Sequence, residues 1–176
     1  MSNPFKQELI SALMREHSIK NTMAIVGLIG GEQKKFDILM DLFFHGEYRI
    51  VQRASWVLGH CGEMHPQLIK KWIKPLLENL SNQVHDAVKR NTVRILQEYI
   101  IPEELSGLAY DQCFKLLISP TEPIAVKAFS MQVLYNITTD IPELKPELAE
   151  AISKQLPFGS AGLKSRGGKI LKLLGY

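Results

Sequence analysis

The distribution of apolar residues along the chain predicts helices throughout. No segment alternates apolar and polar residues with the period of two that is typical of a strand. Between positions 50 and 61, apolar side chains recur at i, i+1, i+4, i+7, i+8 and i+11, a spacing that places them on one side of a helix. These residues are Ile50, Val51, Ala54, Val57, Leu58 and Cys61. The pattern predicts an all-α chain of about ten helices.

This helical pattern repeats along the chain. Similar eight-residue segments begin at Val51, Val88, Val126 and Leu163, so that successive copies are separated by 37, 38 and 37 residues. Prolines keep step with them, because Pro66, Pro102 and Pro142 follow the first three copies by 15, 14 and 16 residues. Proline suits the first turn of a helix, where no backbone donor is lost, so each proline is expected to mark a helix start. These helices are expected to end near Leu80, Ile118 and Leu156.

A single helix pair cannot bury its own apolar face, whereas stacked pairs bury the faces of one another. The period therefore predicts one domain over residues 1–176, with N-terminal helices at 1–31 and repeat units at about 32–61, 65–99, 102–138 and 142–174. The predicted fold class is an all-α solenoid of about four to five helix pairs.

The segment from Leu116 to Lys127, followed by Val133 and Leu134, resembles the HEAT-repeat pattern: a leucine-rich helix, a polar turn and a second helix that starts with Val and a basic residue. The junctions at 41–59, 76–96 and 156–174 are similar, so the resemblance covers nearly the whole chain. Gln52 and Asn91 depart from the pattern and the turn aspartate is mostly missing, so the usual polar ladder between repeats is not implied. The resemblance implies an α-solenoid that serves in binding.

Composition and charge change this picture little. The chain has 176 residues, a net charge of +3 and two cysteines, Cys61 and Cys113. Two distant cysteines do not frame a small disulfide scaffold, so we expect free thiols in the cytoplasm. The first residues show no export signal, and the longest apolar run, 23–31, is too short to cross a membrane. We therefore expect no membrane contact, and the oligomeric state stays open.

One predicted helix, at 47–60, carries a possible ligand face. Arg49, Arg53, Trp56 and His60 occur there at i, i+4, i+7 and i+11, opposite much of the apolar stripe. Guanidinium and aromatic groups interleaved in this way can stack on a base or bind a carboxylate or phosphate. The alternative is that Trp56 fills a contact between repeats.

Further basic residues could form a second binding surface. Lys89, Lys127 and Lys164 occupy equivalent repeat positions and could form a ridge that attracts an acidic partner. Carboxylates such as Asp86 and Glu122 could instead pair with these cations. The segment after Ala151 contains five basic and no acidic side chains, and it could bind an anionic partner or complement its own helix dipole. The remaining basic candidates are Arg90, Arg166 and Lys169.

No motif in the sequence predicts catalysis, a cofactor or a metal site. His60, Cys61 and His65 lack a fourth metal ligand at the usual spacing, and the glycines at 162–168 do not have the spacing of a phosphate loop. The leading hypothesis is a non-enzymatic scaffold with a protein partner on its repeat surface.

Two alternatives remain open. One is nucleic-acid binding, as in HEAT-like bacterial DNA glycosylases, through Trp56, Arg53, Lys89 and Arg90. The other is an enzyme of the fumarase and adenylosuccinate lyase type, whose Gly-Ser-Ser-x-Met-Pro loop does not occur in this sequence.

Overall fold

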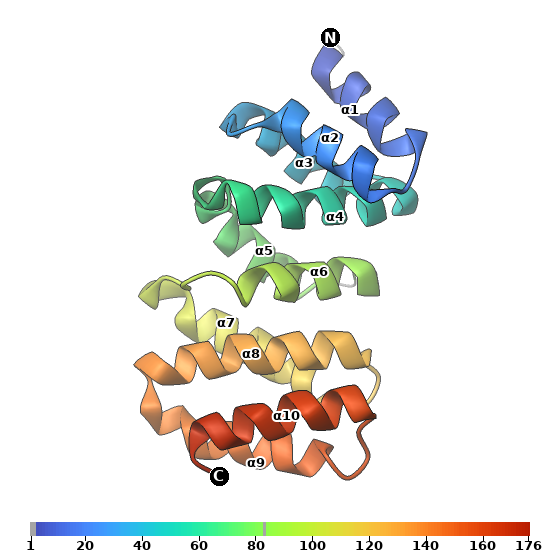
Figure 1. Ribbon diagram of the computed structural model, residues 1–176. Helices are drawn as coiled ribbons and strands as arrows, with labels where there is room; N and C mark the ends of the chain where they lie inside the picture. The colour runs from blue at the N-terminus through green and yellow to red at the C-terminus, as the bar shows by residue number, and fades with distance from the viewer. Residues whose placement is uncertain (1–2, 83) are drawn as a thin grey trace. The chain divides into compact units, whose positions relative to one another are not determined.

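The computed structural model describes residues 3–82 and 84–176. Within these ranges the chain forms ten α-helices and three short 3-10 helices, and no strand (Figure 1). The chain divides into two compact units, the first of which ends at Trp72 and the second of which begins at Ile73. This boundary lies inside the predicted repeat unit at 65–99.

The first unit contains two helix pairs, α1 with α2 and α3 with α4. In addition, α2 contacts α4 and α1 contacts α3, so each pair covers a side of the next. The helices are α1 (Pro4–Arg15), α2 (Ile19–Ile29), α3 (Gln33–His45), α4 (Tyr48–Met64), η1 (Pro66–Leu68) and η2 (Lys70–Trp72).

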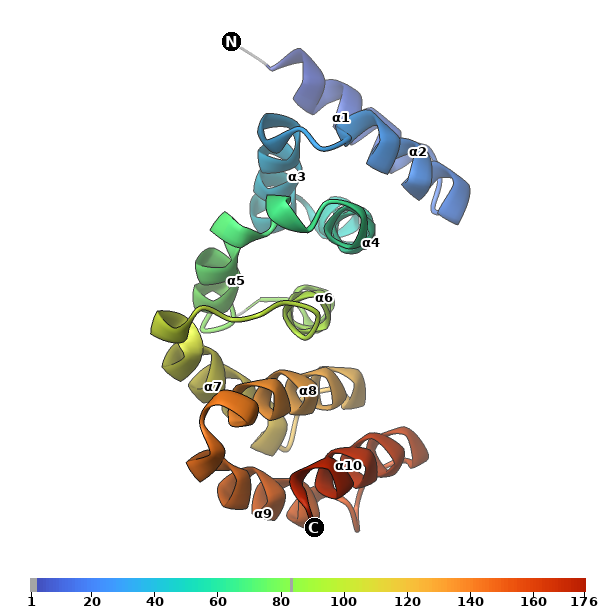
Figure 2. The same ribbon diagram turned by 60° about the vertical axis from the view of Figure 1, so that its left-hand side comes forward.

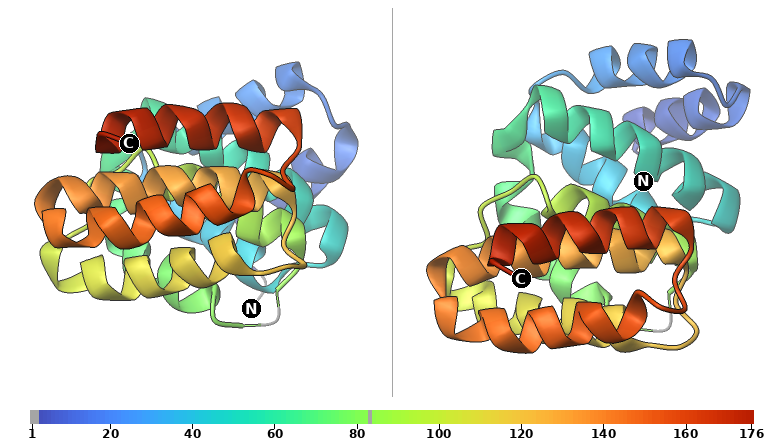
Figure 3. Two further views of the ribbon diagram at one scale, coloured as in Figure 1. Left: turned by 90° about the horizontal axis from the view of Figure 1, so that it is seen from below. Right: turned by 60° about the horizontal axis from the view of Figure 1, so that its bottom comes forward.

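The second unit has two layers of helices. Its elements are α5 (Ile73–Asn79), α6 (Asp86–Leu96), α7 (Glu103–Ile118), α8 (Ile124–Asp140), η3 (Pro142–Leu144), α9 (Lys145–Gln155) and α10 (Ala161–Leu174). Helices α6, α8 and α10 contact one another in order, and α5, α7 and α9 do the same in the other layer (Figure 2). Figure 3 shows the last pair from two further directions, with α10 packed along α8 and α9.

Local sequence signals explain several helix starts. The side chain of Asn3 accepts hydrogen bonds from the amides of Phe5 and Lys6, which lie in the first turn of α1. Ser18 caps α2 and Ser160 caps α10 in the same way. Each cap satisfies an amide that has no partner within its helix.

One predicted helix differs from the structure. Instead of a continuous helix from Pro66 to Leu80, the chain forms η1, η2 and the short helix α5. The physical reason is Pro75, which has no amide hydrogen and would clash with the carbonyl four residues earlier if it lay in a helix interior. In the structure Pro75 is the third residue of α5, where no intrahelical donor is required.

The core of the second unit centres on α8. Buried side chains surround this helix and do not form a single stripe, because α8 has neighbours in both layers. They include polar as well as apolar residues: Val126, Lys127, Ser130, Met131, Val133, Leu134, Ile137 and Thr138. The repeat therefore buries more of its second helix than an amphipathic stripe would.

Two adjacent glycines of α10 allow the packing of the last pair to be tested. A Cβ atom at Gly168 would meet nothing within 4 Å, whereas one at Gly167 would lie 2.5 Å from Cδ2 of Leu156 and 3.0 Å from Cγ2 of Ile152. We expect Gly168→Ala to raise the free energy of unfolding by about 1 kcal/mol, since alanine is the better helix former. Gly167→Ala should lose this gain and fall at least about 1 kcal/mol below Gly168→Ala.

Chemical denaturation followed by helical circular dichroism measures both variants. Equal stabilisation by the two substitutions would contradict the close packing of α10 against α9.

Candidate functional site

The candidate site lies on the side of α4 that faces away from its buried stripe. Val51, Ala54 and Leu58 point into the core, and Arg49 is exposed while Arg53, Trp56 and His60 are half-buried. The helical spacing of these four residues along 17 residues of α4 places them in one row, which we call the α4 row.

Arg53 ties the α4 row to the end of α1. Its Nη1 donates to the backbone oxygen of Leu13 at 2.7 Å. Nearby, Nδ2 of Asn21 donates to the backbone oxygens of Ala12 and Glu16 at 2.9 and 3.0 Å. The last carbonyls of a helix lack intrahelical donors and carry partial negative charge, so a cation and an amide there stabilise the end of α1.

Trp56 lies beside two imidazole rings. Its ring centroid lies 4.8 Å from that of His17 and 6.2 Å from that of His60, with tilted planes in both cases. Nδ1 of His60 lies 3.1 Å from Oε2 of Glu63, and Nε2 of His60 is buried with no hydrogen-bond partner among the described residues. The indole therefore has a ring neighbour on α4 and another just after α1, while part of its surface stays open to solvent.

The three lysines predicted to form a ridge have different environments. Nζ of Lys89 forms an ion pair with Glu122 at 2.5 Å, and their side chains are only 19% and 10% exposed. Lys127 is buried and donates to Oε1 of Gln155 at 3.0 Å. Lys164 is exposed. Two of the three ammonium groups are thus engaged within the protein.

The other basic candidates also differ from one another. Arg90 and Lys169 are exposed, whereas Nη1 of Arg166 donates to Oε1 of Gln132 at 3.1 Å and so joins α10 to α8. The cations of the second unit therefore divide into those that link helices and those that face solvent.

The two cysteines are both buried thiols. Burial raises the pKa of Cys61 and of Cys113 to about 12, so both stay protonated at neutral pH. A protonated, buried thiol is a poor nucleophile and a poor metal ligand. Among the described residues, no three His, Cys, Asp or Glu side chains are grouped so that they could hold a metal ion.

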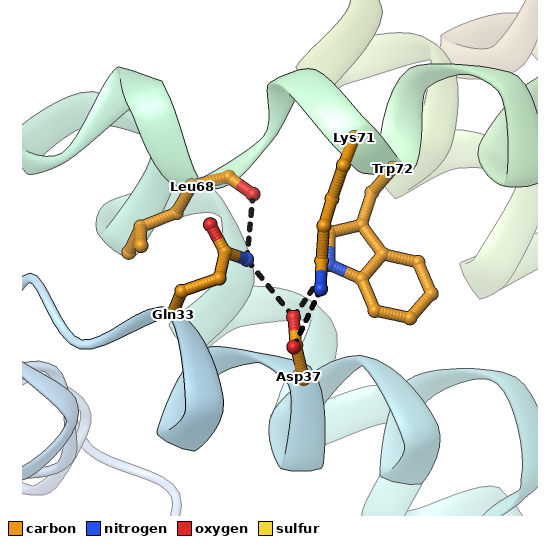
Figure 4. Close-up of polar contacts among 5 residues, drawn as sticks. All are labelled: Gln33, Asp37, Leu68, Lys71 and Trp72. Atoms are coloured by element: carbon orange, nitrogen blue, oxygen red, sulfur yellow. Dashed lines mark hydrogen bonds and ion pairs between the residues drawn. The ribbon is translucent and has the colours of Figure 1, made fainter.

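Sequence reasoning missed a polar cluster that links α3 to η2 (Figure 4). The carboxylate of Asp37 accepts from Nζ of Lys71 at 2.5 Å, from Nε1 of Trp72 at 3.0 Å and from Nε2 of Gln33 at 2.9 Å. The same Gln33 nitrogen lies 3.2 Å from the backbone oxygen of Leu68. We call these five residues the Asp37 cluster.

A signal for the Asp37 cluster was present in the sequence. Asp37 lies 34 residues before Lys71 and 35 before Trp72, which is close to one repeat length. The same separation recurs between Lys6 and Asp41 (35 residues) and between Lys89 and Glu122 (33 residues). Residues one repeat apart lie side by side in stacked helix pairs, so opposite charges at that separation indicate a contact.

Stacked helix pairs that bury the faces of one another define a helical repeat protein. The family model of the HEAT repeat domain matches residues 9–174, nearly the entire chain, and the chain therefore belongs to the HEAT repeat family. Both the resemblance and the predicted all-α solenoid class are confirmed by this match. No curated protein and no solved structure matches the chain. No helix in the described ranges is long and apolar enough to span a bilayer.

The pKa of Asp37 makes the Asp37 cluster sensitive to acid. Burial raises this pKa, but the hydrogen bonds from Lys71, Gln33 and Trp72 and the charge of Lys71 outweigh burial and hold it below its ordinary value of 3.8. Because the folded pKa is the lower one, the ionised carboxylate stabilises the folded chain fully above the unfolded value. This contribution is lost as the pH falls through the lowered folded pKa.

We expect Asp37→Asn to lower the free energy of unfolding by about 1–2 kcal/mol at neutral pH. The difference from the wild type should shrink as the pH drops below 3.8. Urea denaturation followed by tryptophan fluorescence measures this, because Trp56 and Trp72, the only tryptophans of the chain, both belong to the first unit.

The matched control is Glu32→Gln, which removes a carboxylate that is 65% exposed and pairs only locally with Lys35. It should change stability by less than about 0.5 kcal/mol. An effect of Asp37→Asn that is no larger than that of the control, or that persists in acid, would rule out the stabilising role of the Asp37 cluster.

Proposed function

We propose that this chain is a non-enzymatic scaffold that binds a protein partner, and that the α4 row forms part of the binding surface. The observation that carries the proposal is Trp56, a half-buried indole that lies beside the rings of His17 and His60. Tryptophan and arginine are the residues most enriched among those that dominate binding energy at protein interfaces, and exposed Arg49 lies two turns away from Trp56 on the same helix.

Pre-ordering strengthens this proposal. A partner that covers Trp56 would not have to immobilise a free side chain, because the two imidazole rings already restrict the indole. Arg53 adds to the order of the surface, since its hydrogen bond to Leu13 fixes the end of α1 against α4. The proposed binding surface is therefore preorganised in the free protein.

Exposed apolar side chains of the same unit supply further contact area. Met14, Ile19 and Met23 are 41%, 53% and 39% exposed. Ile19 and Met23 are four residues apart on α2, a helix that contacts α4, so they share a face of α2. Methionine side chains adapt their shape to a partner, which suits them to a binding surface.

The alternatives have less support. Binding of nucleic acid would use Trp56 with three cations, Arg53, Lys89 and Arg90. Arg53 and Lys89 contact the Leu13 carbonyl and the Glu122 carboxylate, which leaves Arg90 as the exposed cation of this set. An enzymatic role would need an activated nucleophile or an acid and base pair, and the two cysteines are buried, protonated thiols.

The test compares variants of the full chain as baits in affinity purification from native lysate, followed by affinity measurement with the purified partner. Trp56→Ala should weaken binding at least about tenfold, because truncation of a central interface tryptophan typically removes more than 1.4 kcal/mol. Lys34→Ala, at an exposed position of α3 in the same unit, is the matched control and should bind like the wild type.

Circular dichroism of both variants checks that they are folded. A partner that binds Trp56→Ala and wild type equally would contradict the proposed surface, and turnover of a substrate by the purified chain would contradict the non-enzymatic role.

A further inference from the structure

The second unit contains a pocket that the predicted binding residues do not use. Its volume is about 380 Å³, and it lies where α6 and α8 end and before α7 begins. Its lining includes residues from three places. Gln97 and Glu98 follow α6, Ile100 and Ile101 lie in the connection to α7, and Asn136 and Asp140 lie at the end of α8.

The polar donors of this pocket are already used within the protein. Nδ2 of Asn136 donates to the backbone oxygen of Gln97 at 2.9 Å, and Nε2 of Gln97 donates to Oε1 of Glu98 at 2.9 Å. The hydroxyl groups of Ser106 and Thr139, which also line the pocket, donate to backbone oxygens. The protein thus directs its own amide and hydroxyl donors toward its own acceptors.

Some acceptors of the pocket are already used, since Oε1 of Glu98 accepts from Gln97 and Oδ1 of Asn136 accepts from Gln132, but others remain available for a cation. Asp140 is exposed and makes no hydrogen bond or ion pair with any described residue, and Glu98 has no cationic partner within the described ranges. Oε1 of Gln97 is buried and also lacks a donor among the described residues. This atom of the Gln97 amide is the oxygen because the other one contacts the Glu98 carboxylate. A carboxylate only accepts hydrogen bonds, so the atom beside it must be the amide nitrogen.

Electrostatics add to the preference for a cation. The ends of α6 and α8 carry carbonyl groups without intrahelical donors, and such helix ends have partial negative charge. The pocket lining contains two carboxylates and no lysine, arginine or histidine. A negative pocket on a chain of net charge +3 is a local feature that the overall composition does not suggest.

An apolar wall completes the pocket. Ile101 is buried, whereas Ile100 next to it is 90% exposed, a large exposure for an aliphatic side chain that lines a pocket. Ile137 of α8 contributes further apolar surface. Long basic side chains combine a cationic head with an aliphatic stem, so their two parts match the two kinds of lining.

We infer that this pocket binds a basic side chain of a partner protein, with the cation between Glu98 and Asp140 and a neighbouring apolar residue on Ile100. The inference rests on the proposed scaffold function and adds the chemistry of one partner residue. An arginine or a lysine flanked by aliphatic residues is the sequence that would fit.

The probe is a blocked peptide with one arginine between two leucines, titrated into the isotopically labelled full chain and followed by nuclear magnetic resonance. Its shifts should concentrate on the side-chain amide of Gln97 and the methyl groups of Ile100 and Ile137. A peptide in which citrulline replaces arginine has almost the same shape without the charge, and it should bind at least about tenfold more weakly.

Two double variants separate the pocket from general attraction by acidic residues. Glu98→Gln with Asp140→Asn should weaken binding of the arginine peptide at least about tenfold, and higher salt should weaken binding to the wild type. Asp111→Asn with Glu150→Gln removes two exposed carboxylates that pair locally with Lys115 and Lys154, and should leave affinity unchanged within about twofold.

Equal affinity for the citrulline peptide, equal loss in both double variants, or shifts spread over all acidic surfaces would overturn the inference. Failure of the scaffold proposal would look different, because the natural partner would then bind Trp56→Ala and the wild type equally. The pocket inference can also fail by itself. If the natural partner is lost on Trp56→Ala but binds Glu98→Gln with Asp140→Asn normally, the scaffold proposal stands and the pocket inference is wrong.

Discussion

The structure depends on one constraint: a helix pair has an apolar face that only the next pair can bury. Helix α8 shows the consequence most clearly, because it is buried on several sides by α6, α7, α9 and α10. Its apolar residues Val126, Met131 and Val133 are fully buried, and Ser130 and Thr138 are buried with them. A helix with a single apolar stripe would leave such positions exposed, so the stacking of repeats decides which residues can occupy them.

Polar contacts then fix which residues of neighbouring pairs meet. Most long-range ones join side chains about one repeat apart, such as Asp37 with Lys71 and Lys89 with Glu122. Arg166 and Gln132 repeat the arrangement between α10 and α8. Burial of apolar area has no preferred direction, whereas a hydrogen bond forms only when its two partners align. These polar contacts therefore contribute more to the alignment of neighbouring helix pairs than to total stability.

The sequence predicted the architecture well and the sites less well. Apolar spacing and the 37- to 38-residue period identified the helix pairs, since both follow from local geometry. The break before α5 has its signal in Pro75, which cannot lie in the interior of a helix that begins at Pro66. For Lys89, the sequence left two alternatives open: a basic ridge, or a pair with a carboxylate such as Glu122. The sequence pattern does not distinguish them, because it does not give the direction of the side chains. The pocket beside Ile100 depends on where two helices end, and helix ends are the least predictable part of a sequence.

Hydrogen exchange on a chain that ends at Ile141 tests the central constraint most directly. This truncation removes α9 and α10 and so leaves α8 without two of its neighbours. Mutual burial predicts that the backbone amides of α8 exchange at least about tenfold faster than in the full chain, with little change in α1 and α2. Unchanged protection of α8 would mean that each helix pair is stable by itself, and would contradict the account.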